Sequence, residues 1–386
     1  MRKIIFFAMA MLLCSFFSCQ SESGDSIAQS VVGDQDEDST TATIDGSYRY
    51  QLPVIFHVLY SNRNDTNQYV SYKRIKEILQ NVNELWKGGY YDSEKLGLSQ
   101  DMGVDFVLAN CDENGKRLSQ PGVEYIQYSG TYPIDPYDFL DKESNKKYMW
   151  EPSEYINVML FNFEQSDDDQ TTLGVTNMPY TYKDHHELEG LQTAKYKNLS
   201  KKNLSFCYCS CINSTYQSRR YESSRYSYYN SDSYYMIAQD INNTVAHELG
   251  HYLGLYHVFT EKKTDSGSEP VDSCGDTDYC EDTPSYNYYE YHTFLQDFIN
   301  KNKDQQITMN DIGWRSNCDG ETYTATNFMD YWVCYNNRFT ANQKERVRHV
   351  LYYSPLIPGP KLDAPGSSST RANEEEELLP KPSIVK

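Results

Sequence analysis

Three histidines and one glutamate stand within eleven residues of the sequence, HELGHYLGLYH, which runs from His247 to His257. His247 and His251 are four residues apart, so on a helix their imidazoles lie one turn apart and can bind one ion. Glu248 lies about 100° further around such a helix, close to the ion but poorly placed to bind it. A base that acts on metal-bound water occupies that position. Three neutral imidazoles leave a fourth position open on Zn²⁺, which is typical of a catalytic site.

The third histidine comes six residues after the second, where a continuing helix would point His257 away from the ion. Gly254 lies midway between them, and glycine readily adopts the positive φ that ends a helix and turns the chain back. We therefore predict that the helix over residues 236–254 ends at Gly254, so that His257 returns to the metal as its third ligand.

A methionine-containing segment downstream, NFMDY, runs from Asn327 to Tyr331. Together with the histidine motif and the segment FTANQKERV, it resembles the metzincin zinc peptidases, and in particular the pappalysin-like bacterial lipoproteins. The resemblance implies a zinc endopeptidase in which Met329 lies beneath the zinc and Glu248 is the general base. It also implies a catalytic role for Tyr331, which in some metzincins stabilises the oxyanion.

The same resemblance implies three further features. Cys318 and Cys334, which flank the methionine segment, would form a disulfide bond. The loop GDTDYCEDTP would bind Ca²⁺ through Asp276, Asp282 and Thr283, although a solvated acidic loop is the alternative. The substrate would lie extended along an upper-rim strand of the sheet, for which residues 154–163 (EYINVMLFNF) are the candidate.

The remaining pattern indicates an α/β (α+β) fold in one domain, residues 49–355. Strand composition and helical spacing predict strands at 51–60, 104–109 and 154–163, a helix at 72–88, and a last helix after the capping pair Thr340 and Gln343. The resemblance implies a metzincin catalytic domain with a twisted, mostly parallel sheet, an antiparallel edge strand, an active-site helix, a methionine turn and a C-terminal helix.

The two ends of the chain have a different composition. Residues 1–18 carry two basic residues and then an apolar run, the pattern of a signal peptide, and Cys19 follows the small residue Ser18 as in a lipidation site. Residues 19–48 are acidic and polar, as in a flexible tether, and residues 356–386 are predicted to be a disordered tail. These features predict an exported outer-membrane lipoprotein, periplasmic-facing or at the cell surface, held to the membrane by its lipid anchor only.

The chain has 386 residues and a formal net charge of -20, from 35 basic and 55 acidic residues. Such a charge argues against a nucleic-acid partner. A protein or peptide substrate and a monomeric state are expected. The series Cys207-x-Cys209-x-Cys211 does not have a usual zinc spacing, so free thiols or bonds to other segments are favoured over a second metal site. The alternative function is a surface binding or adhesion lipoprotein with a vestigial zinc site; an exopeptidase is a third possibility.

Overall fold

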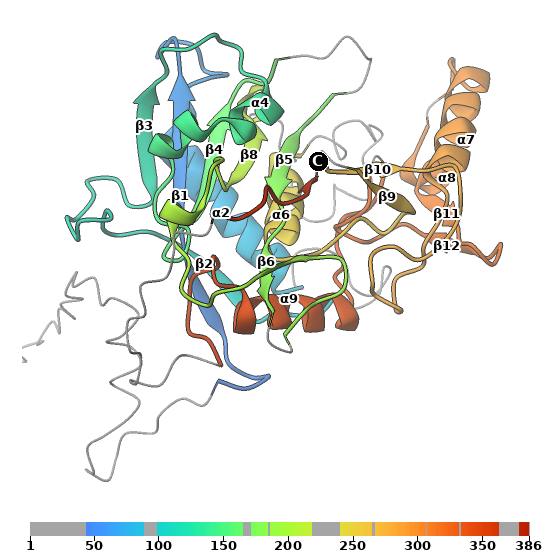
Figure 1. Cartoon of the computed structure of the whole chain (residues 1–386). Helices are drawn as coiled ribbons and strands as arrows, with labels where there is room; N and C mark the ends of the chain where they lie inside the picture. Colours follow the sequence, from blue (N-terminus) through green and yellow to red (C-terminus); the bar gives the residue numbers. More distant parts are fainter. Residues whose placement is uncertain are drawn as a thin grey trace, which may run out of the picture.

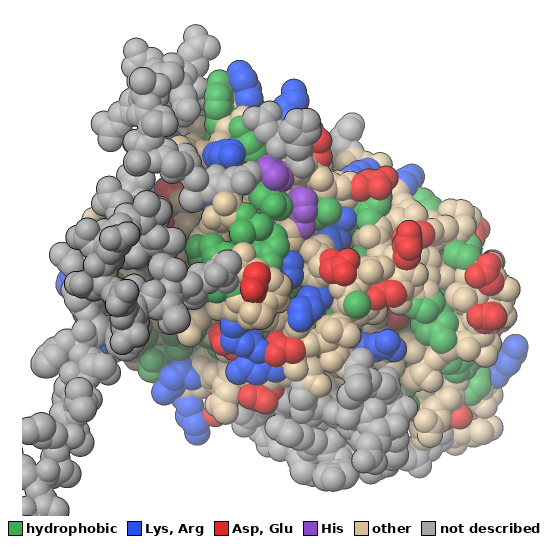
Figure 2. Space-filling model, turned by 90° about the horizontal axis from the view of Figure 1, so that it is seen from below, with side chains coloured by type: hydrophobic (Ala, Val, Ile, Leu, Met, Phe, Trp, Pro, Cys, Tyr) green, Lys and Arg blue, Asp and Glu red, His purple; other side chains and the backbone are tan. Residues whose placement is uncertain are grey.

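The computed structural model describes residues 44–88, 99–164, 171–183, 186–217, 240–264, 267–305, 307–331, 333–362 and 378–385. The predicted signal peptide, Cys19, most of the tether and most of residues 215–235, a tyrosine-rich segment, lie outside these residues. No helix among the described residues is long and apolar enough to cross a membrane. On the face drawn in Figure 2, acidic and basic side chains are interspersed over the described surface.

A long strand, β1 (Tyr50–Tyr60), lies inside the main sheet. The first half of β1 pairs in parallel with β2 (Val104–Leu108), and its second half pairs in parallel with β3 (Val123–Gln127). The middle of β1 pairs in parallel with β4 (Ile156–Phe161). Most side chains of β1 are buried on both faces, as is typical of strands in a parallel sheet.

The other half of the sheet lies beside the helix that carries the predicted metal ligands His247 and His251 (Figure 1). There β4 pairs in parallel with β8 (Ser210–Asn213), and β8 pairs antiparallel with β5 (Gly174–Asn177). The last strand, β13 (Ile384–Val385), pairs antiparallel with β5. The α/β fold class, with a mostly parallel sheet and antiparallel pairing at its edge, is thereby confirmed.

Two predictions are wrong at this edge. The segment 154–163 is not a rim strand, because β4 is paired on both sides, with β1 and with β8. The tail 356–386 is not disordered throughout: residues 378–385 are placed, and Leu379 and Val385 are buried in the fold. The order of this segment comes from its contacts with other parts of the chain, which its own composition does not reveal.

Two helices pack beside each other against the sheet, α2 (Tyr72–Trp86) and α6 (Ile241–Tyr252). The Ser71 side chain caps α2 by accepting a hydrogen bond from the Arg74 amide. The predicted apolar face of α2 is buried: Ile75, Ile78, Leu79, Val82, Leu85 and Trp86. The last helix, α9 (Ala341–Tyr353), begins at the predicted capping box of Thr340 and Gln343.

The remaining elements are short. Before α6 they are α4 (Pro136–Asp141), β6 (Tyr180–Tyr182), β7 (Gln192–Ala194) and the 3-10 helices η1 (Glu143–Tyr148), η2 (Lys201–Asn203) and η3 (Ser214–Tyr216). After α6 they are β9 (Glu261–Thr264), β10 (Gly267–Pro270), α7 (Tyr288–Lys301), α8 (Met309–Ile312), β11 (Trp314–Ser316) and β12 (Thr322–Thr324). Figure 1 shows this second group to one side of the main sheet, beyond α6.

Candidate active site

Helix α6 carries His247 and His251, and the chain turns at its end so that His257 can reach the same point. The Asp240 side chain caps its start by accepting a hydrogen bond from the Asn242 amide at 2.8 Å. At its end Gly254 has a φ of +94°. The amides of Gly254 and Leu255 donate to the carbonyls of His251 and Gly250, both at 2.9 Å. This pair of bonds is the Schellman motif, which reverses the chain after a helix and here brings it back towards α6.

The three histidines meet at one point. Their Nε2 atoms are separated by 2.9 Å (His247 to His251), 3.1 Å (His251 to His257) and 3.2 Å (His247 to His257). A tetrahedral zinc ion with nitrogen ligands at 2.0–2.1 Å holds them roughly 3.3 Å apart. Among the described residues, this is the one group of three or more His, Cys, Asp or Glu side chains whose ligand atoms all lie within 4.8 Å of one another. The donor set and its spacing therefore fit zinc.

The other ring nitrogen of each histidine contacts an oxygen atom at 2.7 Å. The partner of His247 Nδ1 is the Phe328 carbonyl, that of His251 Nδ1 is the Leu255 carbonyl, and that of His257 Nδ1 is the Glu261 carboxylate. An oxygen acceptor requires Nδ1 to carry the proton, which leaves the Nε2 lone pair for the metal. Sequence reasoning missed Glu261, because it lies four residues after the motif and only its contact with His257 identifies it.

Burial favours the neutral form of the two helical histidines. Burial, together with the neighbouring His257, lowers the pKa of His247 to about 3. The pKa of His251 is also well below its usual value, for the same two reasons. Neutral imidazole is the form that binds a metal ion, so both helical histidines are in their ligating form over the physiological pH range.

Glu248 is buried against strand β5. Its Oε2 accepts a hydrogen bond from Thr176 Oγ1 at 2.5 Å. A side chain at Gly174 would collide with it, since a Cβ there would lie 2.4 Å from Glu248 Oε1. Burial raises the pKa of Glu248 to about 8, and the Thr176 hydrogen bond opposes this shift. The segment GVTN is too short to be recognised from sequence as the strand that holds this carboxylate.

Met329 packs against α6 at Gly250. Its side chain is fully buried. Gly250 makes room for it, because a Cβ at Gly250 would lie 2.5 Å from Met329 Sδ. The Met329 carbonyl accepts a hydrogen bond from the Val258 amide at 3.1 Å, which fastens the methionine turn beside His257.

The ring of Tyr331 lies beside the metal ligands. Its centroid is 4.3 Å from that of His257, 6.0 Å from that of His247 and 4.7 Å from that of Phe259. Burial raises the pKa of Tyr331 well above its usual value, so the phenol keeps its proton. A neutral phenol in this position can donate a hydrogen bond.

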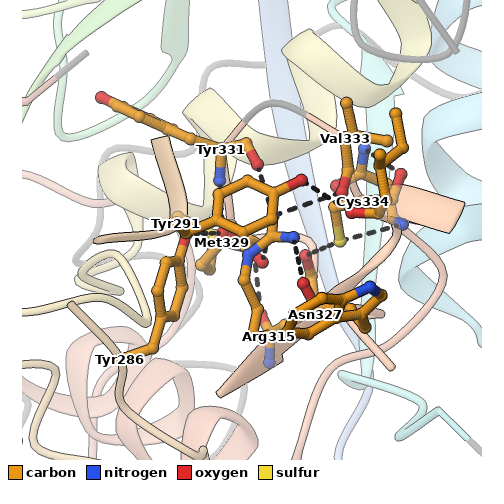
Figure 3. Close-up of polar contacts among 12 residues, drawn as sticks. Tyr286, Tyr291, Arg315, Asn327, Met329, Tyr331, Val333 and Cys334 are labelled. Atoms are coloured by element: carbon orange, nitrogen blue, oxygen red, sulfur yellow. Dashed lines mark hydrogen bonds and ion pairs between the residues drawn. The ribbon is translucent and has the colours of Figure 1, made fainter. Parts of the chain in front are cut away.

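A buried arginine holds the turn from behind (Figure 3). Arg315 forms an ion pair with Asp330, and it donates to the carbonyls of Tyr331 at 3.0 Å and Val333 at 3.2 Å. Its guanidinium carbon lies 3.6 Å from the centre of the Tyr291 ring. The Tyr286 hydroxyl donates to Asp330 Oδ1 at 2.5 Å. In Figure 3 the side chain of Tyr331 points away from this cluster. No local pattern in the sequence identifies Arg315.

The acidic loop after β10 forms hydrogen bonds of its own. Asp276 Oδ1 accepts from the Asp278 amide at 3.1 Å, and Thr283 Oγ1 donates to Asp278 Oδ2 at 2.5 Å. Asp282 Oδ2 accepts from the Asn342 amide at the start of α9, at 3.0 Å. Burial raises the pKa of Asp278 to about 8. The structure thus adds Asp278 to this loop, and calcium binding by Asp276, Asp282 and Thr283 stays a prediction.

The predicted disulfide between Cys318 and Cys334 is wrong. Cys318 is bonded to Cys274, with a Cα–Cα distance of 5.4 Å, whereas Cys334 is a buried free thiol. Cys334 turns inward, with its Sγ 3.2 Å from the Asn327 carbonyl. The other free thiols include the row Cys207, Cys209 and Cys211, whose neighbouring Sγ atoms are 3.7 Å and 3.9 Å apart in the protein interior.

Comparison with known proteins supports the resemblance. Residues 214–352 match the sequence profile of the peptidase family described as pregnancy-associated plasma protein-A, in agreement with the predicted resemblance to pappalysin-like metzincins. No curated protein sequence matches the chain.

Among solved structures, mature mirolysin of Tannerella forsythia in complex with a cleaved peptide is 21% identical to this chain, with a TM-score of 0.49. The match covers 78% of this chain and 91% of the mirolysin chain. Mirolysin in complex with compound 9 is 20% identical, with a TM-score of 0.46, covering 79% and 92%. A promirolysin mutant of Tannerella forsythia is 19% identical, with a TM-score of 0.46, covering 79% and 81%.

Proposed function

Because residues 214–352 carry the sequence of a pappalysin-type metzincin metalloprotease, we propose that this chain is a zinc endopeptidase with Glu248 as its general base. The observation that carries the proposal is the convergence of three histidine Nε2 atoms within 3.2 Å, beside a buried carboxylate. His247, His251 and His257 would hold the ion. When bound, zinc would supply a Lewis acid that polarises the peptide carbonyl and acidifies a water molecule.

The chain's own residues supply proton transfer and orientation. Glu248 takes a proton from the attacking water and gives it to the leaving amine. Thr176 holds this carboxylate in place through its hydrogen bond. Tyr331, whose ring lies against His257, donates from its phenol to the oxygen that becomes negatively charged.

The substrate peptide would lie along β5, and not along residues 154–163 as predicted from the sequence. The strand β5 runs antiparallel to its neighbour and contacts both α6 and Glu248. An extended peptide that pairs with its outer edge would bring a scissile bond towards the three histidines.

The test is Glu248→Ala, which removes the base and leaves every zinc ligand in place. We expect the variant to bind zinc as the parent does, by elemental analysis, and to lose cleavage of denatured casein by about 10²-fold or more. Glu143→Ala is the matched control, since the Glu143 side chain is exposed on η1, and it should cleave at the parental rate.

Two outcomes of this test separate the alternatives. Full casein cleavage by Glu248→Ala would refute the assignment of the base. Zinc-loaded protein that cleaves neither casein nor peptides, both as the full chain and after removal of residues 363–386, would favour a binding or adhesion protein with a vestigial zinc site. Activity confined to free chain ends would indicate an exopeptidase.

Anchoring and calcium binding are further parts of the proposal. Lipid attachment at Cys19 would place the enzyme at the outer membrane, and labelled fatty acid should enter the parental chain but not Cys19→Ser. Calcium held by Asp276, Asp282 and Thr283, with Asp278 beside them, would stabilise the loop. A chelator selective for calcium over zinc should then lower the melting temperature. An unchanged melting temperature would indicate a solvated acidic loop that binds no calcium.

A further inference from the structure

We propose that residues 378–385 cover the substrate edge of β5, so that the chain blocks its own peptide-binding strand until this segment is released or removed. This inference rests on the proposed endopeptidase function, because it concerns the same site. The covering segment belongs to the chain itself, and it contacts β5, β10 and β7.

The segment pairs with β5 beside the catalytic carboxylate. Ile384 lies opposite Asn177, and Val385 lies opposite Thr176. Thr176 is the residue whose hydroxyl holds Glu248. The ordered part of the segment therefore reaches the position on β5 next to the general base.

The pairing uses the backbone groups that a substrate would need. The Met178 amide, directly after β5, donates to the Ser383 carbonyl at 2.9 Å. An extended peptide that adds to a sheet edge binds through these same main-chain hydrogen bonds. Since β5 is paired with β8 on its other side, it has one edge to offer, and β13 occupies it. A substrate and β13 cannot share this edge at the same time.

The side chains of the segment extend the contact towards the metal site. Val385 is buried in a cluster with Met178 and Tyr256, the residue directly before the ligand His257. On the opposite side, the Ile384 carbonyl lies so close to Gly267 that a Cβ there would be 2.1 Å from it. The segment thus lies between β5 and β10, and Figure 1 shows it in that position, in front of α6.

Earlier residues of the segment are fixed as well. The Leu379 amide donates to the Asn203 carbonyl at 2.8 Å, and the Leu379 side chain is buried. The Tyr180 hydroxyl donates to the Pro380 carbonyl, and Gln192 donates to the Lys381 carbonyl at 3.0 Å. Lys381 forms an ion pair with Asp141. These contacts hold the segment across the sheet edge at several points.

The first experiment compares the full chain with a chain that ends at Leu362. If only the uncovered fraction of molecules can bind substrate, removing the cover raises kcat/KM by the inverse of that fraction. We expect a rise of about tenfold or more on an internally quenched peptide, with equal zinc content in both forms. Equal kcat/KM in the two forms would overturn the proposal.

A single substitution tests the same point without truncation. Val385→Asp places a charge in the buried cluster with Met178 and Tyr256, so it should release β13 and raise kcat/KM in the full-length chain. Leu378→Asp is the matched control, because Leu378 is 59% exposed, and it should leave the rate unchanged. An increase of the same size in both variants would count against the assignment.

A synthetic peptide of residues 376–386 tests occupancy directly. It should inhibit the chain that ends at Leu362 competitively, and the same peptide with Val385→Asp should inhibit at least about tenfold more weakly, as expected when a charge replaces a buried apolar anchor. If the shortened chain cleaves substrate and neither peptide inhibits it, the covering role fails while the endopeptidase function stands. If no form cleaves although zinc is bound, the endopeptidase function fails, and the covering role fails with it.

Discussion

Arg315 and Asp330 form a buried ion pair directly behind the methionine turn, with 3.1 Å between Nη2 and Oδ2. The same arginine donates to the carbonyls of Tyr331 and Val333. One guanidinium therefore fixes both the acidic residue of the turn and the backbone that follows it. The pair keeps Met329 and Tyr331 in register with the histidines above them.

Substitution of Arg315 by methionine should strongly destabilise the fold. It leaves the Asp330 carboxylate buried without its cation, which typically costs about 3–5 kcal/mol. Urea denaturation measures the free energy of unfolding. The exposed Arg338→Met should change that free energy by less than about 0.5 kcal/mol. Adding Asp330→Asn to Arg315→Met should recover part of the loss, and no recovery would show that the ion pair is not its source.

Substitution of Glu261 by alanine should weaken zinc binding without removing a ligand. The carboxylate orients His257 through a 2.7 Å contact with Nδ1, and loss of such a partner typically lowers metal affinity 10–100-fold. Competition with a fluorescent zinc chelator measures the affinity. Glu261→Gln keeps an acceptor oxygen, so its zinc affinity should lie between that of the parent and that of Glu261→Ala. The exposed Glu290→Ala should bind zinc with the parental affinity. Parental affinity in Glu261→Ala would contradict the role given to this side chain.

Substitution of Gly174 by alanine should impair catalysis but not metal binding. The new Cβ would lie 2.4 Å from Glu248 Oε1, so the carboxylate must move away from its present position. We expect kcat to fall by about tenfold or more, since displaced catalytic groups lose their orientation, while zinc content stays at the parental level. Gly46→Ala is the control, because a Cβ at Gly46 would meet no atom within 4 Å. Unchanged kcat in Gly174→Ala would mean that Glu248 works equally well when displaced.

Asp278 should make stability depend on pH in the absence of calcium. Its pKa is about 8 in the folded protein and about 3.9 in an unfolded chain. Between these values the folded state binds more protons, so this group lowers the free energy of unfolding as the pH rises from about 4 to about 8. Asp278→Asn removes the titration. The stability of the variant relative to the parent should therefore increase from pH 5 to pH 8 in thermal or urea unfolding, and a constant difference would exclude the shifted carboxyl as the cause.

Local spacing in the sequence predicts a large part of the site. The histidines, Glu248 and the reversal at Gly254 all follow from positions within one helix and its cap. Strand order depends on pairing between distant segments, so composition identifies β4 as a strand but does not show that it lies inside the sheet. Glu261 and Arg315 act through contacts that no short pattern encodes. The predicted disulfide between Cys318 and Cys334 was wrong for the same reason, because only folding brings Cys274 next to Cys318.

The hydrogen bond from His247 to the Phe328 carbonyl joins residues 81 positions apart. Synthesis from the N-terminus therefore completes the HELGHYLGLYH segment well before the turn that orients its first imidazole exists. Full affinity for the ion arises only when that later segment has docked, which makes metal capture a late event in the biogenesis of the protein. Retention of the ion therefore also depends on an intact chain. A cut between α6 and the methionine turn would lower the affinity for the metal although all three histidines remain.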